Sequence, residues 1–597
     1  MSNSTIPSEA RATTKYTLSP ATRPQKRSLR ESGGKFLFLF ASEKKPFIAA
    51  VGAIVFSSIA TLVAPVLIIR TIDTDIRLGN THGLLISALI ILAIYVSGSV
   101  ASYIQVITMG SVGRRVLYHL RNALFLKLQD LPVAFFNQNK AGDLISRLNS
   151  DTDKLNQFVA QSLMQFVGSV FLITGAAIFL VGLNIKLGLA ALMPAIAVVL
   201  VTRGTSAWIK RMNLGSLQAL GGMSSEVQES LNNFKVIVAF NRVDYFRWKF
   251  NSANEKNFSA STTAGFANNI FMPLYGLASH LAQLLVVAYG IYLIEAGQVT
   301  LGLLIGFLLY VNNLYGPMRQ LATVWSSFQL AMAALDRISE VMALESNLPV
   351  IEPAAAESDS VLTFRQVWFH YPDGKEVLRD VSFEMERGKA YALVGPTGGG
   401  KTTTANLMAR LYDPTRGSVL LHGRDIRSYT PDERAQKIGF ILQDPFLFSG
   451  SVRDNIVYGN ESYRDFSSKQ LAEVLEEANL SSLISRFPEG LDTVVTTSGN
   501  SISLGQKQLI AFMRAALRRP ELLILDEATA NIDTVTEELL QEILNKLPAT
   551  TTRVIIAHRL NTIDNVDQIF FVNSGEITLA GSMEHAVDML LHEKRAS

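Results

Sequence analysis

The feature that most restricts the fold of this chain is a set of six long stretches without a charged side chain, all before residue 320. They span residues 46–69, 83–113, 155–185, 187–202, 257–294 and 296–318. A helix needs about 20 apolar residues to cross the hydrocarbon layer of a membrane. The sequence therefore predicts six membrane-spanning helices, of which the fourth has the least defined boundaries. Several stretches exceed this length, so we expect helices that continue beyond the bilayer.

Composition agrees with a membrane protein and excludes several other classes. Of the 597 residues, 48% are hydrophobic and only 18% are charged, which is unusual for a soluble protein. The net charge of +3 is too weak to indicate nucleic-acid binding. The chain has no cysteine, which excludes disulfides, thiolate catalysis and cysteine zinc sites. Its length predicts more than one domain.

Lysine and arginine residues predict the orientation in the membrane. The connections expected outside, residues 70–82, 184–186 and 295–298, are short and nearly charge-balanced, whereas the inner connections are long and basic. By the positive-inside rule, both termini face the cytosol, which predicts a multi-pass protein of the cytoplasmic membrane. Inner connections of roughly 40 to 50 residues are longer than a connection needs, so we expect them to extend the spans into the cytosol.

The chain divides into four parts. Residues 1–34 lack the features of a cleavable signal peptide and are predicted to be a flexible cytosolic tail. An all-α membrane domain is expected over 35–342, and a Pro-, Ala- and acid-rich linker over 343–359. From 360 to 597, short β-rich runs alternate with helical patterns, which predicts an α/β domain.

The strongest chemical signal is a phosphate-binding loop in "ALVGPTGGGKTTTANLM". An apolar strand at 391–394 runs into the pattern Gly-x-x-x-x-Gly-Lys-Thr, and a helix follows. Glycines let backbone N–H groups surround the phosphates, the lysine supplies a point charge, and the threonine hydroxyl holds Mg²⁺. The predicted nucleotide-binding residues are Gly395, Pro396, Thr397, Gly398, Gly399, Gly400, Lys401, Thr402 and Thr403, with Thr402 also a Mg²⁺ ligand.

A second signal is "ELLILDEATANID", in which an acidic pair ends an apolar strand at 522–525. Ligands of open parallel sheets lie at the carboxyl ends of the strands. Asp526 is therefore predicted in the Mg²⁺ shell, and Glu527 is predicted to polarise the attacking water. An acidic pair at a strand end is also common in solvated turns, but its distance downstream of the phosphate loop favours the catalytic interpretation.

Together these features resemble the ATP-binding-cassette (ABC) transporters, over roughly residues 35 to 590. The resemblance implies an exporter half-transporter: a six-helix membrane domain of the type I exporter fold, followed by an α/β P-loop nucleotide-binding domain that uses ATP and Mg²⁺. In the family pattern, Tyr371 of "WFHYPDG" stacks on adenine, and Gln443 of "FILQDP" senses Mg²⁺ and contacts the membrane domain. His558 of "VIIAHRLNTI" matches the switch histidine, and Asp533 of "ANID" matches a residue of the dimer interface.

Two inner segments also resemble the family. Residues 131–151 and 230–250 are similar to the intracellular segments whose short transverse helices rest on the nucleotide-binding domains. A solvated helical face would have the same pattern, so the sequence assigns no contact residues in either segment.

The family's signature sequence departs from its usual form in this chain. Leu-Ser-Gly-Gly-Gln is expected, and the matching residues are Ile502, Ser503, Leu504, Gly505 and Gln506. The resemblance implies that Ser503, Gly505 and Gln506 contact ATP held by the opposite subunit, and that Leu504 crowds its γ-phosphate. The downstream position usually held by arginine is Leu509.

This combination of an intact hydrolytic half and an altered signature predicts an unlike partner. Each ATP site of the family is built from the phosphate loop of one subunit and the signature of the other. A homodimer would carry the altered signature in both sites, whereas a heterodimer would carry it in one. The chain therefore resembles the catalytically competent subunit of heterodimeric bacterial multidrug exporters with one degenerate site.

Several alternatives stay open. A homodimer that tolerates leucine, a lipid flippase and an importer on the exporter architecture fit the same motifs. An ATP-binding regulatory subunit is less favoured, because Glu527 and His558 are both present. The expected substrate is an amphipathic drug, a lipid or a peptide-like molecule, by analogy with the family alone.

Few residues in the spans bear on substrate binding. Aromatic and pliable residues either line an apolar cavity or serve helix packing: Phe271, Met272, Tyr275, Tyr310 and Tyr315. Asp73 and Asp75 follow the first span, where they belong to an outer gate or, by the preferred interpretation, to a solvated loop.

Overall fold

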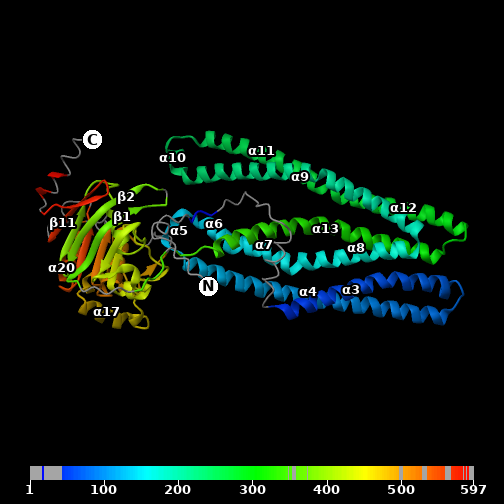
Figure 1. The fold of residues 1–597 in the computed structure, drawn as a ribbon, viewed down its shortest axis with the longest axis horizontal. Helices are drawn as coiled ribbons and strands as arrows, with labels where there is room; N and C mark the ends of the chain where they lie inside the picture. The colour runs from blue at the N-terminus through cyan, green and yellow to red at the C-terminus, as the bar shows by residue number, and fades with distance from the viewer. Residues whose placement is uncertain are drawn as a thin grey trace. The chain divides into compact units, whose positions relative to one another are not determined.

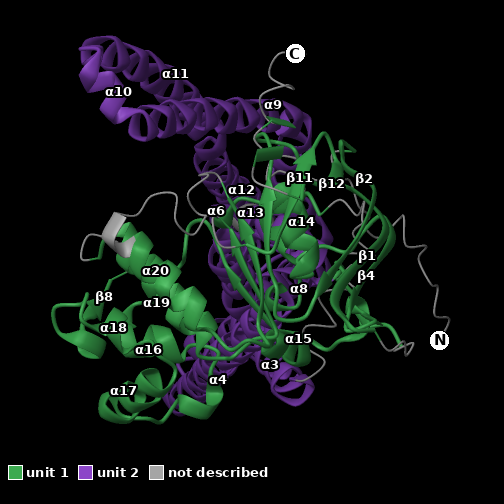
Figure 2. Ribbon diagram, turned by 90° about the vertical axis from the view of Figure 1, so that its left-hand side faces the viewer, with its two compact units in different colours: residues 1–18, 128–141, 343–597 green, residues 19–127, 142–342 purple. Residues whose placement is uncertain are grey.

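The computed structural model divides the chain into two compact units, which are coloured separately in Figure 2. It describes residues 16–18, 43–346, 348–352, 358–372, 374–496, 502–526, 534–557, 566–581, 584–585 and 588–589. We call residues 43–127 and 142–342 the helical unit. The α/β unit combines three separate stretches, 16–18, 128–141 and the described residues after 342.

Within the described residues, six helical segments are long and apolar enough to cross a membrane. They are Lys44–Ile76, Thr81–Gln129, Ala141–Leu183, Ile185–Asn232, Val243–Glu295 and Leu301–Met342. Five contain at least 42 residues, about twice what a bilayer requires. The six predicted spans are confirmed, and so is their continuation into longer helices (Figure 1).

The segments are built from the following elements. They are α3 (Lys44–Arg70), η1 (Thr71–Ile76), α4 (Thr81–Gln129), α6 (Ala141–Ser146), η2 (Arg147–Asp151), α7 (Thr152–Gln157), η3 (Phe158–Ser162), α8 (Leu163–Leu183), α9 (Ile185–Asn232), α10 (Phe234–Ala239), α11 (Val243–Asn269), α12 (Phe271–Glu295) and α13 (Leu301–Met342). A single residue, Asn184, separates α8 from α9, and its side-chain oxygen accepts hydrogen bonds from the N–H groups of Lys186 and Leu187. This N-cap sets the boundary of the fourth span, which the apolar pattern left open.

The core of the helical unit contains three of the aromatic residues considered for a substrate cavity. Tyr275, Tyr310 and Tyr315 are each at most 7% exposed. The Tyr310 hydroxyl donates to the Leu62 carbonyl at 2.6 Å, and the Tyr315 hydroxyl donates to the Ala191 carbonyl at 3.0 Å. Buried hydroxyls with backbone partners are typical of helix packing. The packing interpretation therefore accounts for these three tyrosines.

Asp73 has a structural role that the sequence did not indicate. One of its carboxylate oxygens accepts from the Thr300 hydroxyl at 2.5 Å, and the other accepts from the Gly302 N–H at 3.0 Å. The first turn of α13 is thereby capped by a residue of the segment that follows α3. A Cβ on Gly302 would lie 2.7 Å from the Ile69 carbonyl oxygen, so glycine permits this close approach. The preferred interpretation of Asp73 as part of a solvated loop was wrong.

A network of charged residues joins the start of the third helical segment to α13. Arg147 is 1% exposed, and its guanidinium contacts Asp143 at 2.9 Å and Glu340 at 2.8 Å. Arg337 of α13 pairs with Asp151 at 2.8 Å and also with Asp143. Arg147 and Asp151 are the most buried members, each 1% exposed, so loss of their partners would be costly.

The α/β unit contains two main sheets. An antiparallel sheet has the order β2-β1-β4-β5, and a second sheet has the order β12-β11-β3-β10-β9-β6 with only β12 antiparallel. The strands are β1 (Ser360–His370), β2 (Glu376–Glu386), β3 (Ala390–Val394), β4 (Arg416–Leu421), β5 (Arg424–Asp425), β6 (Ile438–Ile441), β9 (Leu522–Asp526), β10 (Thr552–Ile556), β11 (Gln568–Asn573) and β12 (Glu576–Leu579). This mixed architecture confirms the predicted α/β class.

Helices of the α/β unit fall into three groups. α14 (Lys401–Met408) and α15 (Pro431–Lys437) follow strands of the sheets, and a helical region packs around α19 (Leu504–Ala516). The other helices of that region are α16 (Val452–Val457), α17 (Ser468–Glu477), α18 (Ser481–Ile484) and α20 (Thr534–Lys546). The third group is α5 (Val133–Gln138), which comes from the first inner segment yet belongs to this unit.

Candidate nucleotide-binding site

The predicted phosphate loop connects β3 to α14. All five residues of β3 are buried, and the strand lies between β10 and β11 in the centre of the parallel sheet. Gly400 occupies the N-cap of α14 with φ 119°, and Gly395 and Gly398 have φ 144° and 86°. Residues with a side chain rarely adopt positive φ values of this kind, so the backbone conformation of the loop requires glycine at these positions.

Close packing imposes a second requirement on the loop. A Cβ on Gly395 would collide with the Val572 carbonyl oxygen of β11, and one on Gly399 would lie 2.6 Å from the same atom. The loop therefore packs closely against β11, and α14 begins directly after it. Backbone N–H groups at a helix N-terminus form a site for phosphate.

Lys401 and Thr402 begin α14 directly after the loop. The Lys401 ammonium is buried and donates to the carbonyls of Gly395 at 2.8 Å and Pro396 at 3.0 Å. The positive charge is thus held inside the loop that the phosphates would enter. The Thr402 side chain is exposed at the first turn of the helix, where its hydroxyl is accessible to a metal ion.

The other predicted groups follow neighbouring strands at the same edge of the sheet. Ile556 of β10 pairs with Leu393 of β3 and with Asp526 of β9, so these three strands end together. Ile441 of β6 pairs with Leu525, and Gln443 therefore follows one residue beyond the level of Asp526. Carboxyl ends of parallel strands are the usual ligand edge of such sheets.

Asp526 itself is the last residue of β9 and is 4% exposed. Glu527 and Asp533 lie outside the described residues, and so does His558, two positions after the end of β10. Their sequence positions put Glu527 directly after Asp526 and His558 after the adjacent strand.

Tyr371, predicted to stack on adenine, lies next to the phosphate-loop helix. It directly follows β1, and its hydroxyl is 3.1 Å from the Thr403 hydroxyl of α14. The structure thus brings two segments of the predicted site together although they are 32 residues apart in the chain.

The altered signature forms the start of α19. Ser503 is the N-cap: its hydroxyl accepts from the Gln506 N–H at 3.2 Å, and the Gln506 side chain accepts from the Ser503 N–H at 2.9 Å. This reciprocal capping box defines the helix start. Leu504 is the first helical residue and is half-buried, and its φ is not among the positive values of the chain. The backbone at this position therefore does not require glycine.

Comparison with known proteins assigns the chain to a family. Residues 47–318 match the model of the ABC transporter transmembrane region, and residues 378–530 match the ABC transporter model. The uncharacterized ABC transporter ATP-binding protein YfiC of Bacillus subtilis is 34% identical over 560 residues, which cover 92% of this chain and 90% of that protein. This chain is an ABC transporter.

Two further relatives define the type of ABC transporter. A multidrug resistance ABC transporter ATP-binding and permease protein of Lactococcus lactis is 31% identical over 498 residues, covering 83% of this chain and 84% of that protein. A structure of a bacterial Atm1-family ABC exporter with ATP bound has a TM-score of 0.75 at 25% identity, covering 92% of this chain and 96% of that one. The chain is an exporter half-transporter of the type I fold and an ATPase coupled to transport, and a half-transporter functions as a dimer in a lipid bilayer.

The residues of this ABC transporter fit a Mg²⁺–nucleotide complex. Mg²⁺ is usually held by one or two carboxylates together with waters and substrate phosphates. Asp526 supplies a buried carboxylate and Thr402 an exposed hydroxyl. Among the described residues, no group of three or more His, Asp or Glu side chains would hold a metal ion by itself. This donor set suits an ion that arrives with the nucleotide.

Sequence reasoning missed Tyr412, which contacts the predicted adenine site. Tyr412 is 8% exposed, and its ring lies edge-on to Tyr371 at 5.3 Å and to Phe369 at 5.7 Å. Burial raises the pKa of its phenol. The Asn137 side chain of α5 donates to the Tyr412 hydroxyl at 2.9 Å. In the sequence, Tyr412 could have been found as the aromatic residue of "ARLYDP", shortly after the phosphate-loop helix.

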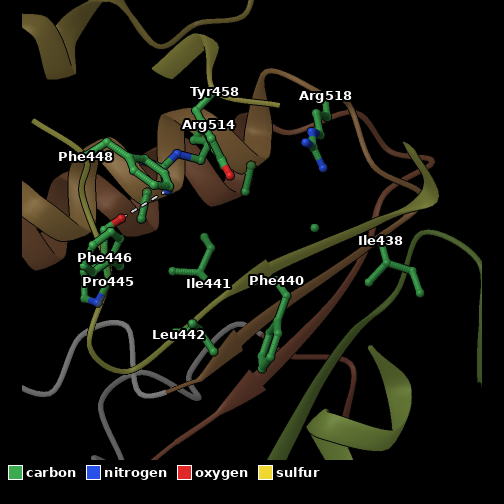
Figure 3. A pocket seen from close by; sticks show the side chains of 13 residues that line it. Ile438, Phe440, Ile441, Leu442, Pro445, Phe446, Phe448, Tyr458, Arg514 and Arg518 are labelled. Atoms are coloured by element: carbon green, nitrogen blue, oxygen red, sulfur yellow. Dashed lines mark hydrogen bonds between the residues drawn. The ribbon is translucent and has the colours of Figure 1, made fainter. Parts of the chain in front are cut away.

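A groove lies beside Gln443, between the edge strand β6 and α19 (Figure 3). Leu442 and Pro445, on either side of Gln443 in the chain, contribute to its lining. Arg514 of α19 donates to the Asn455 carbonyl at 2.7 Å, and its guanidinium lies 5.4 Å from the centre of the Tyr458 ring. The ABC transporter thus has a groove of mixed polar and apolar lining, with Arg514 held in place by these contacts, close in the chain to the predicted Mg²⁺-sensing glutamine.

Proposed function

We propose that this chain is one subunit of a heterodimeric exporter that uses ATP to move an amphipathic drug, a lipid or a peptide-like molecule out across the cytoplasmic membrane. The observation that carries the proposal is the common edge of β3, β9, β10 and β6, where the phosphate loop, Asp526 and Gln443 meet in a chain with six membrane-spanning segments. The Lactococcus lactis relative, described as a multidrug resistance protein, supports the substrate class.

In the proposed site, the residues divide the binding and hydrolysis of ATP among them. The loop from Gly395 to Thr403 binds the phosphates, Tyr371 stacks on adenine, and Thr402, Asp526 and Gln443 complete the Mg²⁺ shell. Glu527 polarises the attacking water, and His558 is the switch histidine. The partner subunit provides a signature opposite this phosphate loop, while Ser503, Gly505, Gln506 and Asp533 of this chain face the nucleotide of the partner.

ATP would act by binding across two subunits. A nucleotide that bridges both subunits favours the closed dimer over the open one, and the difference in ATP affinity between the two states drives the change. Closure displaces the inner helices and turns the transport pathway outward, and hydrolysis resets the cycle. Both termini and the α/β unit lie in the cytosol in this scheme.

Leu504 supports an unlike partner. Since its backbone is an ordinary helix start, any penalty of the leucine would fall on the nucleotide that approaches this helix end, not on the stability of the chain. The damage would then be confined to one of two sites if the partner carries a normal signature. A homodimer would have two weakened sites.

The decisive experiment is ATP turnover by this chain purified with the product of a neighbouring transporter gene. Glu527→Gln should lower turnover at least about 100-fold, because a general base contributes that much or more. Undiminished turnover would show that this chain is not the hydrolytic half. One-to-one assembly supports the heterodimer, and a stable homodimer with rapid turnover at two equal sites rejects it.

A further inference from the structure

Two residues near the N-terminus are buried in the α/β unit. Tyr16 is 1% exposed and Leu18 is 8% exposed, whereas the Thr17 side chain between them faces solvent. Their contacts are with α5 and the residue that follows it, more than 110 positions away in the chain. Two buried side chains that bind to such distant parts of the sequence indicate a specific binding site.

Two side chains of the first inner segment hold the backbone of this tripeptide. The amide of Asn139 accepts from the Leu18 N–H at 3.0 Å and donates to the Tyr16 carbonyl at 2.9 Å. The Gln138 side-chain oxygen accepts from the Tyr16 N–H at 2.8 Å. Main-chain hydrogen bonds of this kind provide affinity for an extended peptide, and side-chain pockets provide specificity.

The Tyr16 side chain supplies that specificity. Its ring lies edge-on to Phe135, with 6.3 Å between ring centres at 90°. Its hydroxyl donates to the Glu345 carbonyl at 2.9 Å. Phenylalanine would fill the same space but could not form this hydrogen bond, so the site is selective for tyrosine. Glu345 lies three residues after Met342, where α13 ends, and one side chain therefore connects α5 with the linker region.

We infer that Tyr16–Leu18 is a docking segment that fastens α5 to the start of the linker and thereby restrains the transport cycle. A conformation that separates α5 from Glu345 has to break these hydrogen bonds and expose the Tyr16 ring. The docked segment stabilises conformations in which the two stay together, by its differential binding free energy. This role is additional to the proposed export function and does not depend on the identity of the partner or substrate.

Docking is measurable directly because the chain has no cysteine. The variant Thr17→Cys places a single cysteine at an exposed position, and a nitroxide is attached to it. The labelled full-length transporter is then measured in lipid nanodiscs. Electron paramagnetic resonance should show an immobilised label in the otherwise unchanged protein. Tyr16→Ala, which alters nothing in α5, and Asn139→Ala should both convert most of the signal to a mobile one. Lys140→Ala, an exposed neighbour of Asn139, should leave the label immobile.

Conservative variants distinguish docking from a general loosening of α5. Asn139 also donates to the Phe135 carbonyl at 2.8 Å, so its replacement weakens the end of the helix as well. Tyr16→Phe removes only the bond to Glu345 and should produce an intermediate mobile fraction. A label that is mobile in the unchanged protein, or that stays immobile in Tyr16→Ala, overturns the docking site.

The restraint has its own readout in ATP hydrolysis. Release of the segment by Tyr16→Ala should raise the basal kcat about two- to fivefold, as expected when one or two hydrogen bonds that slow a transition are lost. The KM for ATP should not change, because the hydrogen bonds described above join the segment to Gln138, Asn139 and Glu345, and none of these three is predicted to bind ATP. If Tyr16→Ala makes the label mobile but leaves kcat unchanged, the docking site is supported and its restraint of the transport cycle is rejected. Absence of ATP turnover in every variant would reject the proposed function and leave the label measurement valid.

Discussion

At the scale of single residues, Lys401 and Leu504 bear on the two halves of the ATP cycle. Lys401 is buried among carbonyls of the phosphate loop, so its charge is fixed before phosphate arrives. Leu504 begins a helix without backbone strain. In the function proposed above, Lys401 serves the ATP site of this chain, and Leu504 acts on the ATP site of the partner subunit.

Replacing Lys401 should weaken ATP binding without unfolding the chain. Hydrogen bonds to charged groups contribute about 1.5–3 kcal/mol, which corresponds to roughly 10- to 150-fold in dissociation constant. We expect Lys401→Ala to show a loss in this range by equilibrium binding of a fluorescent ATP analogue. Lys469→Ala, an exposed lysine of α17, is the matched control and should bind normally.

Leu504→Gly should raise ATP turnover of the chain when it is purified and paired with itself. Removing the side chain opens the approach of phosphate to the first N–H groups of α19, and an increase of about tenfold or more is expected if one charge-assisted hydrogen bond is regained. Glycine in a helix is less stable than leucine by up to about 1 kcal/mol. Lys507→Gly carries the same helix penalty and should not raise turnover; an equal rise in both variants would contradict the steric explanation.

At the scale of elements, α5 connects the first inner segment to the nucleotide site. The link runs from Asn137 to Tyr412 by a hydrogen bond, and from Tyr412 to Tyr371 by ring contact. The sequence indicated a transverse helix in residues 131–151 but assigned no contacts to it. Spacing within one segment cannot reveal which side chain of a helix meets a tyrosine 275 positions away.

A double-mutant cycle measures the first link in this contact. Asn137→Ala and Tyr412→Phe each remove the same hydrogen bond, so each should raise the KM for ATP by about two- to fivefold, the equivalent of one hydrogen bond. The double variant should be no worse than either single variant. Additive effects would mean that the two residues act independently.

The motifs made the geometry of the phosphate loop predictable, for a physical reason. A phosphate loop depends on local backbone geometry, so Gly395 and Gly400 mark it in the sequence. The six spans were predictable because the bilayer fixes their length. Asp73 was not, because a helix cap formed by a residue of another helix leaves no local pattern. Glu527, Asp533 and His558 lie outside the described residues and stay predictions.

At the scale of the whole molecule, α10 has an apolar face that we expect a second subunit to cover. This short helix joins α9 and α11 at the end of a helical hairpin (Figure 1). Large apolar side chains along it are more than half exposed: Phe234, Val236, Val238 and Phe240. A single subunit leaves this face open, and a dimer of half-transporters provides a surface to cover it.

Phe240→Asp should therefore weaken the dimer. Burial of a phenylalanine side chain contributes about 2 kcal/mol, so the dissociation constant should rise roughly 30-fold. The measurement is the dimer fraction against concentration by mass photometry in detergent. Lys235→Glu changes the charge of the same helix outside the apolar set and should retain the dimer; if it dissociates as readily, charge and not apolar contact holds this face.

The α/β unit is assembled from stretches that lie far apart in the chain, and this has a consequence for biosynthesis. Residues 128–141 belong to this unit, but its main body begins at residue 343, roughly 200 residues later. At about 5–20 residues per second, a ribosome needs on the order of 10–40 s to produce the missing part. During that interval the Asn137 side chain of α5 cannot donate to the Tyr412 hydroxyl, because that tyrosine has not yet been made. In the nascent transporter, α5 therefore gains its hydrogen bond to Tyr412 only after all six membrane-spanning segments have been made.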